Sequence, residues 1–389
     1  MSRITSLKLE NVGQIKCADV TFGDLTVLVG PQATGKSIFL QLLRLALDKG
    51  YISDQLRMRG ADWGGKKNEF LDLYLGEGMC RIWRSRGSHP CSVLRVNGRR
   101  LHVGDLASPW QARRKPVVFY IPAQRVLSLA NGWPKVFTDF AGKDPFAVRD
   151  FSDTFRLLME REINKHDELF PRSKHLKQGY RNLLSQDIFA GFELRVDRRG
   201  GQKRLILKKS ASSEGIPFMA WSAGQREFIP LLMGLYWLLP DAHKTRRRSL
   251  EWVIIEEPET GLHPRAISAV MLLMADLLWR GYRVCLSTHS PHVLDVVWAL
   301  EIIQRHKAEP DRLLEVFGAK ISPSMREVAA SVMKKRAKVY YFDREGMTHD
   351  ISALDPGASE GSEAGWGGLT EFSGRIADVV ASVVNQSSR

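Results

Sequence analysis

The sequence predicts an α/β protein with a mixed sheet. Apolar runs suited to strands buried on both faces occur at 26–29 and 252–255. The first run is followed by a glycine-rich loop and then by apolar residues at helical spacing, and the second ends in acidic residues. A third run, at 282–286, ends in polar residues that include a histidine. The chain therefore places chemically distinctive residues at the ends of buried strands.

The composition is that of a soluble globular protein, with 389 residues of which 44% are hydrophobic and 26% charged. The 57 Lys and Arg against 43 Asp and Glu give a formal net charge of +14, which indicates an acidic partner such as nucleic acid. No apolar run reaches the roughly 20 residues of a membrane span, and the first residues do not resemble a secretory signal. The 4 cysteines form no CxxC pair. We therefore expect a cytoplasmic protein with no membrane contact.

The loop after the first apolar run carries a phosphate-binding motif. The string G-x-x-x-x-G-K-S lies between a strand and a helix, which is the context that this motif requires. Its glycines let backbone N–H groups point inward, and the helix N-terminus adds positive partial charge. We expect the Lys36 side chain to reach the β- and γ-phosphates of ATP and the Ser37 hydroxyl to ligate Mg²⁺. The predicted nucleotide-binding residues of this loop are Gly30, Pro31, Gln32, Ala33, Thr34, Gly35, Lys36 and Ser37.

Two glutamates and a histidine complete the predicted catalytic set, together with Lys36. Glu256 and Glu257 end the second buried run, where carboxylates can hold Mg²⁺ and orient a water for attack on the γ-phosphate. We expect Glu256 on the metal side and Glu257 as the catalytic base. His289 follows the third run and is expected to contact the γ-phosphate and sense its hydrolysis.

A further anion-binding candidate precedes the apolar helix predicted at 228–239. Ser222, Gly224 and Gln225 stand at the entry of this helix, where a hydroxyl, backbone amides and the helix dipole can meet an anion. The plain alternative is an N-cap that serves only its own helix.

In this order the motifs resemble the ATP-binding-cassette (ABC) type ATPase heads of the RecF, SMC and OLD families. The opening strand at 7–12, the SAGQ string, EEPETGLHP at 256–264 and STHS at 287–290 carry the resemblance. It covers 1–49 and about 216–305 well, and the chain between them loosely. One departure is Glu256, which stands where these families usually have Asp.

The resemblance implies a composite ATP site between two chains. In such heads, Ser222, Gly224 and Gln225 of one protomer would close on the phosphate loop of the other, so that ATP joins a homodimer or higher oligomer. A second helix N-terminus excludes water and stabilises charge in the transition state. Gln124 falls where the Q-loop of the family lies and is implied to assist Mg²⁺; a Gln leaving a strand is otherwise unremarkable.

The segments between the motifs predict an inserted antiparallel β lobe and a helical insertion. Residues 70–75 and 91–96 alternate as strands do, and Asn97-Gly98 is a hairpin turn signal. Residues 126–190 look mostly helical, and 191–209 predict a hairpin around Gly200-Gly201.

After residue 306 we expect a small C-terminal α/β unit with a helix at 325–335 and a strand at 339–342. A linker at 356–368 and a terminal helix at 370–384 follow. The expected units are an ATPase lobe with the β lobe (1–125), the helical insertion and basic hairpin (126–215), an ATPase lobe with signature, acidic strand and histidine (216–306), and a candidate partner-binding unit (307–389).

No second active site is evident, and the residues after 305 are few for a nuclease domain. Two-component prokaryotic defence systems with an OLD-like ATPase look like this, so the resemblance implies an ATPase that hydrolyses ATP at a dimer interface to control a separate effector protein, a nuclease or toxin, in prokaryotic anti-phage defence. The alternative is a RecF-like DNA-binding ATPase in DNA repair. Dispersed basic clusters fit either a DNA backbone or an acidic partner protein. The SAGQRE and EEPETGLHP strings disfavour a transporter subunit.

Overall fold

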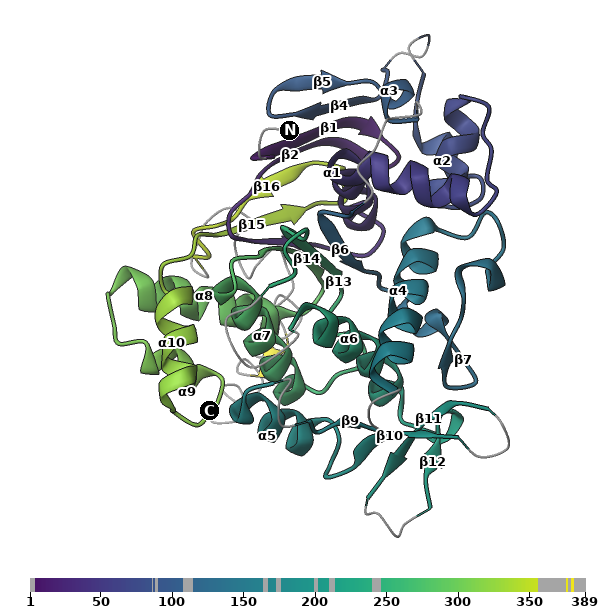
Figure 1. The fold of residues 1–389 in the computed structure, drawn as a ribbon. Coiled ribbons are helices and arrows are strands. Elements are labelled where there is room, and N and C mark those ends of the chain that lie inside the picture. Colours follow the sequence, from purple (N-terminus) through teal and green to yellow (C-terminus); the bar gives the residue numbers. More distant parts are fainter. Residues whose placement is uncertain are drawn as a thin grey trace.

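The computed structural model describes residues 4–85, 87, 90–107, 115–163, 167–172, 176–198, 202–209, 214–239, 246–355, 376, 379 and 380. Its centre is a six-stranded sheet with the order β16-β15-β3-β14-β13-β6 (Figure 1). The strands are β3 (Leu25–Val29), β6 (Val118–Ile121), β13 (Trp252–Glu256), β14 (Arg283–Thr288), β15 (Ala337–Phe342) and β16 (Thr348–Asp350). All pairs are parallel except β15 with β16, so the sheet is mixed, as the sequence predicts.

Alternate residues of the central strands enter two separate cores. Val27 of β3 and Val253 of β13 face a core that also contains the helices α6 (Ala223–Leu238), α7 (Pro264–Trp279) and α8 (Pro291–Arg305). Their neighbours in sequence, Leu28 and Ile254, face the other core, which contains α1 (Lys36–Met58). Because both faces are covered, these strands are apolar throughout rather than alternating. The parallel strands thus end at one edge, where the predicted motifs gather.

An antiparallel sheet packs with α1 on that second face. Its order is β2-β1-β4-β5, formed by β1 (Ser6–Val12), β2 (Ile15–Thr21), β4 (Val93–Val96) and β5 (Arg99–Leu101). The predicted turn between β4 and β5 is confirmed, since Asn97 and Gly98 both have positive φ, 49° and 78°. The inserted β lobe is therefore present, although it uses the N-terminal hairpin as well as the insertion.

The strand expected at 70–75 is wrong, because these residues belong to helix α2 (Lys67–Leu75). Phe70, Leu71, Tyr74 and Leu75 are the buried residues of this helix. Spacings of one and four residues place them on one helical face. The short helix α3 (Val103–Ala107) also lies within this expected β region.

The helical insertion contains both helices and strands. Helix α4 (Phe146–Ile163) and helix α5 (Gln178–Asp187) form as expected, with η2 (Arg125–Ser128), η3 (Phe137–Asp139), β7 (Leu129–Ala130) and β8 (Trp133–Pro134) before them. The predicted hairpin is confirmed as β10 (Glu193–Asp197) and β11 (Arg204–Lys208). It lies in a sheet of order β12-β11-β10-β9 with β9 (Glu168–Phe170) and β12 (Ile216–Pro217). The Gly200-Gly201 turn itself lies outside the described residues.

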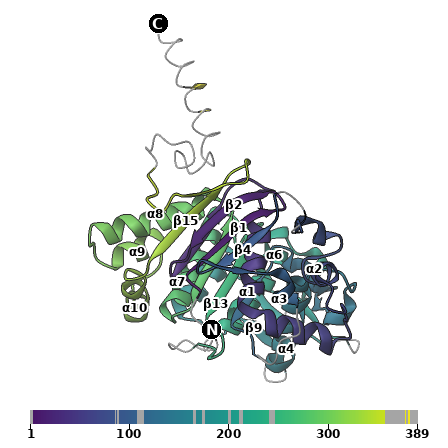
Figure 2. The ribbon, with the colours of Figure 1, turned by 90° about the horizontal axis from the view of Figure 1, so that it is seen from above.

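The expected C-terminal elements form, and their strands extend the central sheet. Helices α9 (Asp311–Val316) and α10 (Pro323–Val332) precede β15, which pairs with β3 beside the phosphate loop. Two views at right angles place α9 and α10 on the side of the molecule opposite α2 and α3 (Figures 1 and 2). The expected linker at 356–368 and nearly all of the expected helix at 370–384 lie outside the described residues. In the part of the chain that the structure describes, no helix combines the length and apolarity of a membrane span.

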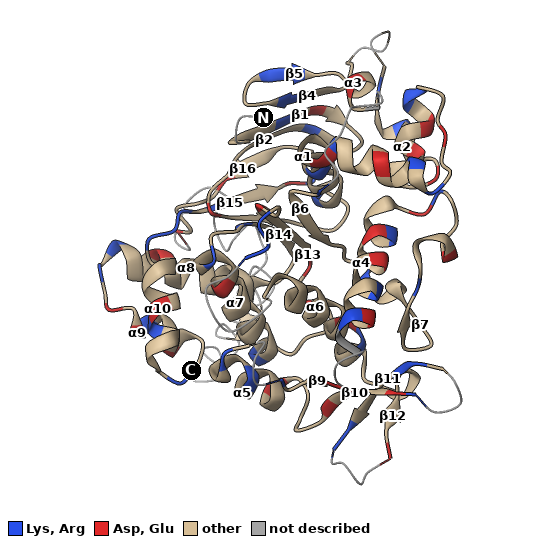
Figure 3. Cartoon of the chain, in the orientation of Figure 1, with Lys and Arg blue, Asp and Glu red and all other residues tan. Residues whose placement is uncertain are grey.

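Basic residues are spread over many elements rather than gathered in one band (Figure 3). Several members of the predicted basic clusters are matched by acids: Arg95 with Glu10, Arg204 with Asp197, and Lys338 with Asp350. Exposed pairs of this kind contribute little to stability, yet they neutralise charge that a DNA backbone would need. The Lys and Arg residues behind the net charge of +14 are therefore distributed over several elements of the described chain.

Candidate active site

The phosphate loop joins β3 to α1 in a conformation that requires glycine at two positions. Gly30 has φ 142°, and a Cβ there would lie 2.2 Å from the carbonyl oxygen of Phe342. Gly35 has φ 99°, and a Cβ would lie 2.5 Å from the side chain of Ile15. Both distances are shorter than any real contact, so the backbone of β15 and the β1–β2 hairpin shape the loop from outside.

A cavity of about 300 Å³ opens beside this loop. It is lined by Gln14, by the loop and helix residues Gln32, Ala33, Thr34, Gly35, Lys36, Ser37 and Ile38, and by Glu257 and His289. Four separate segments of the chain therefore share one cavity. Gln14, from the turn between β1 and β2, is a member that sequence reasoning missed, because no local motif marks it.

The Lys36 ammonium lies inside the loop. Its Nζ donates to the carbonyl oxygens of Gly30 at 2.7 Å and Pro31 at 2.6 Å, and to Thr34 Oγ1 at 3.4 Å. Burial lowers the Lys36 pKa to about 8, against the opposing effect of Glu257. The charge is thus held where the β- and γ-phosphates of a nucleotide are expected.

Glu256 is buried, with 1% of its surface exposed, and two hydroxyls address it. Tyr120 donates to Oε1, and the nearby Ser37 hydroxyl, like that of Tyr120, acts to lower the pKa of the carboxyl group. Burial nevertheless raises the Glu256 pKa, and its Oε2 atom has no hydrogen-bond partner. An unpaired buried carboxylate oxygen beside a hydroxyl is a suitable start for Mg²⁺, which takes few protein ligands and completes its shell with phosphate and water oxygens. No larger cluster of His, Cys, Asp and Glu suited to a metal occurs among the described residues.

Glu257 contacts the predicted sensor directly. Its Oε1 atom lies 3.2 Å from His289 Nε2, and its Oε2 atom accepts a hydrogen bond from Thr260 Oγ1 at 3.3 Å. The hydrogen bond from His289 lowers the Glu257 pKa, against the effect of partial burial. A carboxylate held in its charged form and lining the cavity can accept a proton from a water there.

Glu259 holds the histidine loop in place, a role that sequence reasoning missed. Its Oε1 atom accepts hydrogen bonds from Thr288 Oγ1 and from the His289 backbone N–H, both at 2.7 Å. The side chain therefore ties the segment after β13 to the segment after β14. The sequence shows Glu259 only as one of several glutamates after the second buried strand. It does not show that the side chain contacts the segment after β14.

Ser222, Gly224 and Gln225 lie at the entry of α6, where Ser222 is exposed and Gly224 and Gln225 are half-buried. Ser222 Oγ accepts from the Gln225 N–H at 3.3 Å, and Gln225 Oε1 accepts from the Ser222 N–H at 3.2 Å, which is a capping box. Within one chain these two side chains serve their own helix, as the plain alternative expects. Gly224 packs tightly, since a Cβ there would lie 2.5 Å from the Gly261 carbonyl oxygen. None of the three lines the phosphate-loop cavity of its own chain.

Gln124 is exposed at the start of η2 and does not line that cavity. Its neighbour Arg125 is instead fully buried and reaches the residues after β13. The segment after β6 thus contacts the site through Arg125, a residue that the sequence did not single out.

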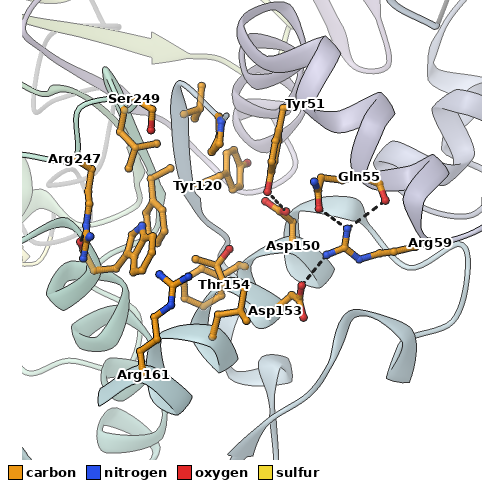
Figure 4. A pocket seen from close by; sticks show the side chains of 17 residues that line it. Tyr51, Gln55, Arg59, Tyr120, Asp150, Asp153, Thr154, Arg161, Arg247 and Ser249 are labelled. Carbon is orange, nitrogen blue, oxygen red and sulfur yellow. Dashed lines mark hydrogen bonds and ion pairs between the residues drawn. The ribbon is translucent and has the colours of Figure 1, made fainter. Parts of the chain in front are cut away.

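A second, separate cavity of about 440 Å³ lies between α1, β6 and α4 (Figure 4). Asp150 there accepts hydrogen bonds from Tyr51 and from buried Arg44, and Arg59 pairs with Asp153. Tyr120, which bonds Glu256, also lines this cavity. Its polar groups are largely matched to one another.

Over residues 122–295 the chain matches a family model described as "AAA domain, putative AbiEii toxin, Type IV TA system". No curated protein matches.

Among solved structures the chain is similar to the SMC head domain from Thermotoga maritima, at 12% identity and a TM-score of 0.31, covering 75% of this chain and 91% of that one. It is also similar to an SmcHead bound to the C-winged helix domain of ScpA, at 12% identity and a TM-score of 0.39, covering 89% of this chain and 96% of that one. A third similar structure is cbiO1 from Clostridium perfringens, part of the ABC transporter complex cbiONQ, at 11% identity and a TM-score of 0.33, covering 89% of this chain and 88% of that one. Similarity at this level bears on neither function nor partners.

The strand order, the phosphate loop and the acidic strand beside it give this chain the α/β fold of a P-loop NTPase.

Proposed function

We propose that the chain hydrolyses ATP with Mg²⁺ at a site shared between two copies. One observation carries the hydrolysis: a single cavity is lined by the phosphate loop and by the hydrogen-bonded pair Glu257 and His289. Directly beside it, the Ser37 hydroxyl lies near the buried carboxyl group of Glu256. Binding, metal and proton-accepting groups therefore meet at one place, which is the set that phosphoryl transfer to water needs.

Each group has a role in this proposal. Lys36 and the loop amides bind the β- and γ-phosphates, and Ser37 with Glu256 holds Mg²⁺, which neutralises charge on the phosphate oxygens. Glu257 accepts the proton of the attacking water, and His289 contacts the γ-phosphate. The metal-assisting role of Gln124 stays a prediction, since its side chain lies outside the cavity.

Ser222, Gly224 and Gln225 are proposed to act on the nucleotide of a second copy. The exposure of Ser222 at the N-terminus of α6 supports this, because a helix N-terminus presents backbone amides and positive partial charge to an anion. ATP would then hold two copies together until hydrolysis releases them.

The test is a comparison of wild type with Glu257→Gln. Wild type is expected to release phosphate only with both ATP and Mg²⁺. The variant is expected to bind ATP normally and accumulate as an ATP-bound dimer, because the base is lost and the phosphate contacts remain. Normal turnover by the variant contradicts the role of Glu257, and equal dimerisation of Lys36→Ala with and without ATP contradicts the ATP-dependent contact.

We further propose that this cycle controls a separate effector, a nuclease or toxin, in prokaryotic anti-phage defence. The matched family, whose description names a putative toxin of a toxin–antitoxin system, supports this direction. The spread of basic side chains over many elements, with Arg95, Arg204 and Lys338 each paired with an acid, favours this interpretation over a DNA-binding surface.

The effector is tested with the Glu257→Gln variant as a trap in native cells. Enrichment of one nuclease or toxin that depends on ATP supports defence. Salt-sensitive, ATP-dependent binding of duplex DNA by the purified chain alone supports a DNA-repair clamp instead.

A further inference from the structure

Arg125 joins two separate segments through three of their backbone carbonyls. Its guanidinium is fully buried, and Nε donates to the Glu227 carbonyl at 3.0 Å, Nη1 to the Glu256 carbonyl at 3.0 Å and Nη2 to the Glu257 carbonyl at 3.1 Å. Glu227 lies near the start of α6, whereas Glu256 and Glu257 end β13. The planar donor fork therefore fixes the distance between the signature helix and the catalytic carboxylates.

The charge of Arg125 is incompletely matched, which argues against a purely stabilising role. The nearest described carboxylate oxygen with which it pairs is Glu227 Oε2 at 3.9 Å, beyond hydrogen-bond distance, and that oxygen has no hydrogen-bond partner. Burial lowers the Arg125 pKa and raises that of Glu227. A well-packed apolar side chain often stabilises a buried position as well as a charged one does or better. The presence of a charged guanidinium here therefore indicates that Arg125 orients neighbouring groups.

The backbone that Arg125 holds is in an unusual conformation. Glu257 has φ 45°, a left-handed conformation that residues other than glycine rarely adopt. Its N–H donates to the Ser287 carbonyl at 3.0 Å, and Arg125 binds its carbonyl, so both sides of the residue are restrained. These two contacts orient the Glu257 side chain toward His289 and the cavity.

A second contact joins the same two segments. The Gly224 Cα lies against Gly261, and a Cβ built on Gly224 would lie 2.5 Å from the Gly261 carbonyl oxygen. The entry of α6 therefore rests on the turn that follows Glu257. A displacement of this helix entry is transmitted to the turn at Gly261 by packing and to Glu257 by Arg125.

We propose that Arg125 is a positioning residue that couples the signature helix to Glu257 of the same chain. This inference rests on the proposed function. In that dimer, the α6 entry of one copy contacts the nucleotide of its partner, while Glu257 of the same copy serves its own nucleotide. Arg125 thus links the two ATP sites: closure at one site orients the base at the other, and hydrolysis becomes cooperative in ATP.

The experiment compares wild type with Arg125→Lys and Arg125→Met in the full chain. Steady-state hydrolysis is measured over a range of ATP concentrations, and ATP binding is measured by calorimetry in a Glu257→Gln background. Wild type is expected to give a Hill coefficient near 2. In both variants the Hill coefficient is expected to fall to about 1 while ATP affinity stays within about twofold, and Arg125→Met is expected to lose roughly 100-fold in kcat, the order of effect of a misplaced base. The lysine variant is expected to recover part of kcat but not the cooperativity, since one ammonium cannot span three carbonyls.

Arg283 supplies a matched control at the opposite end of the central sheet. It is also a buried arginine bound to backbone carbonyls, those of Ile4, Phe22 and Gly23, and it lies away from the site. Arg283→Lys is expected to lower thermal stability about as Arg125→Lys does, but to keep the wild-type Hill coefficient and kcat.

The outcomes separate the two levels of the proposal. Wild-type kcat and cooperativity in Arg125→Lys, or a Hill coefficient of 1 in an active wild type, overturn the coupling alone. Equal losses in the Arg125 and Arg283 variants show a structural effect and also overturn it. A wild type without Mg²⁺-dependent hydrolysis overturns the proposed function together with this inference.

Discussion

Tyr120→Phe removes one of two hydroxyls that address the buried carboxyl group of Glu256. Tyr120 is 3% exposed and Glu256 1%, so water cannot replace the lost donor. A hydrogen bond to a charged group contributes about 1.5–3 kcal/mol, and we expect the free energy of unfolding to fall by this amount at pH values where Glu256 is ionised. The Ser37 hydroxyl remains near the carboxyl group, which places the expected loss toward the lower end.

The effect has a definite pH dependence. The Tyr120 hydrogen bond favours the charged form of Glu256, so its removal raises further a pKa that burial already raises. As the pH falls, Glu256 becomes protonated in the variant at a higher pH than in wild type. The Tyr120 hydrogen bond stabilises the neutral carboxyl group less than the charged one. The stability difference is therefore expected to be fully present at high pH and to shrink as the pH falls.

Urea unfolding of wild type and Tyr120→Phe at pH 8 and pH 5.5 measures this difference. Tyr74→Phe is the matched control, because the equally buried Tyr74 hydroxyl donates to the neutral Gln41 carbonyl at 2.7 Å. That change is expected to cost about 0.5–1.5 kcal/mol at both pH values. A Tyr120→Phe effect that is no larger than the control at pH 8, or that does not change with pH, refutes the reasoning.

Three further predictions concern other parts of the site. Gly30→Ala is expected to abolish ATP binding in equilibrium dialysis, because its Cβ would lie 2.2 Å from the Phe342 carbonyl oxygen. The control Gly60→Ala, also at positive φ but in open space, should bind ATP as wild type does. Equal ATP binding by the two variants contradicts this account of the loop. Glu259→Ala is expected to lower kcat about tenfold, since the His289 loop loses its acceptor, and Glu259→Gln should restore most of it; wild-type kcat in the alanine variant argues against this role. Lys36, whose pKa falls from an ordinary 10.5 to about 8, binds fewer protons folded than unfolded between these values, so the nucleotide-free protein should gain stability as the pH rises through this range. Thermal unfolding of Lys36→Met should show less of that gain, and an unchanged gain is the contrary result.

The sequence by itself determined the local parts of this protein. The phosphate loop, the buried strands at β13 and β14 and the Asn97-Gly98 turn each follow from residues adjacent in the chain, because glycine conformation and apolar runs act over a few residues. The order of the motifs then indicated which strand ends lie together. The pattern misled at 70–75, where a short apolar segment fits both a strand and one face of helix α2.

Tertiary structure alone decided how the site is held together. Tyr120 meets Glu256 across 136 positions of sequence, and Arg125 meets Glu257 across 132. Gln14 reaches the cavity from the β1–β2 turn, and the carbonyl oxygen of Phe342 in β15 leaves no room for a side chain at Gly30. These contacts depend on which strands are neighbours in the sheet, and no local propensity encodes that. The chain thus carries its chemistry in short motifs, while the fold supplies the burial and the distant donors that orient them.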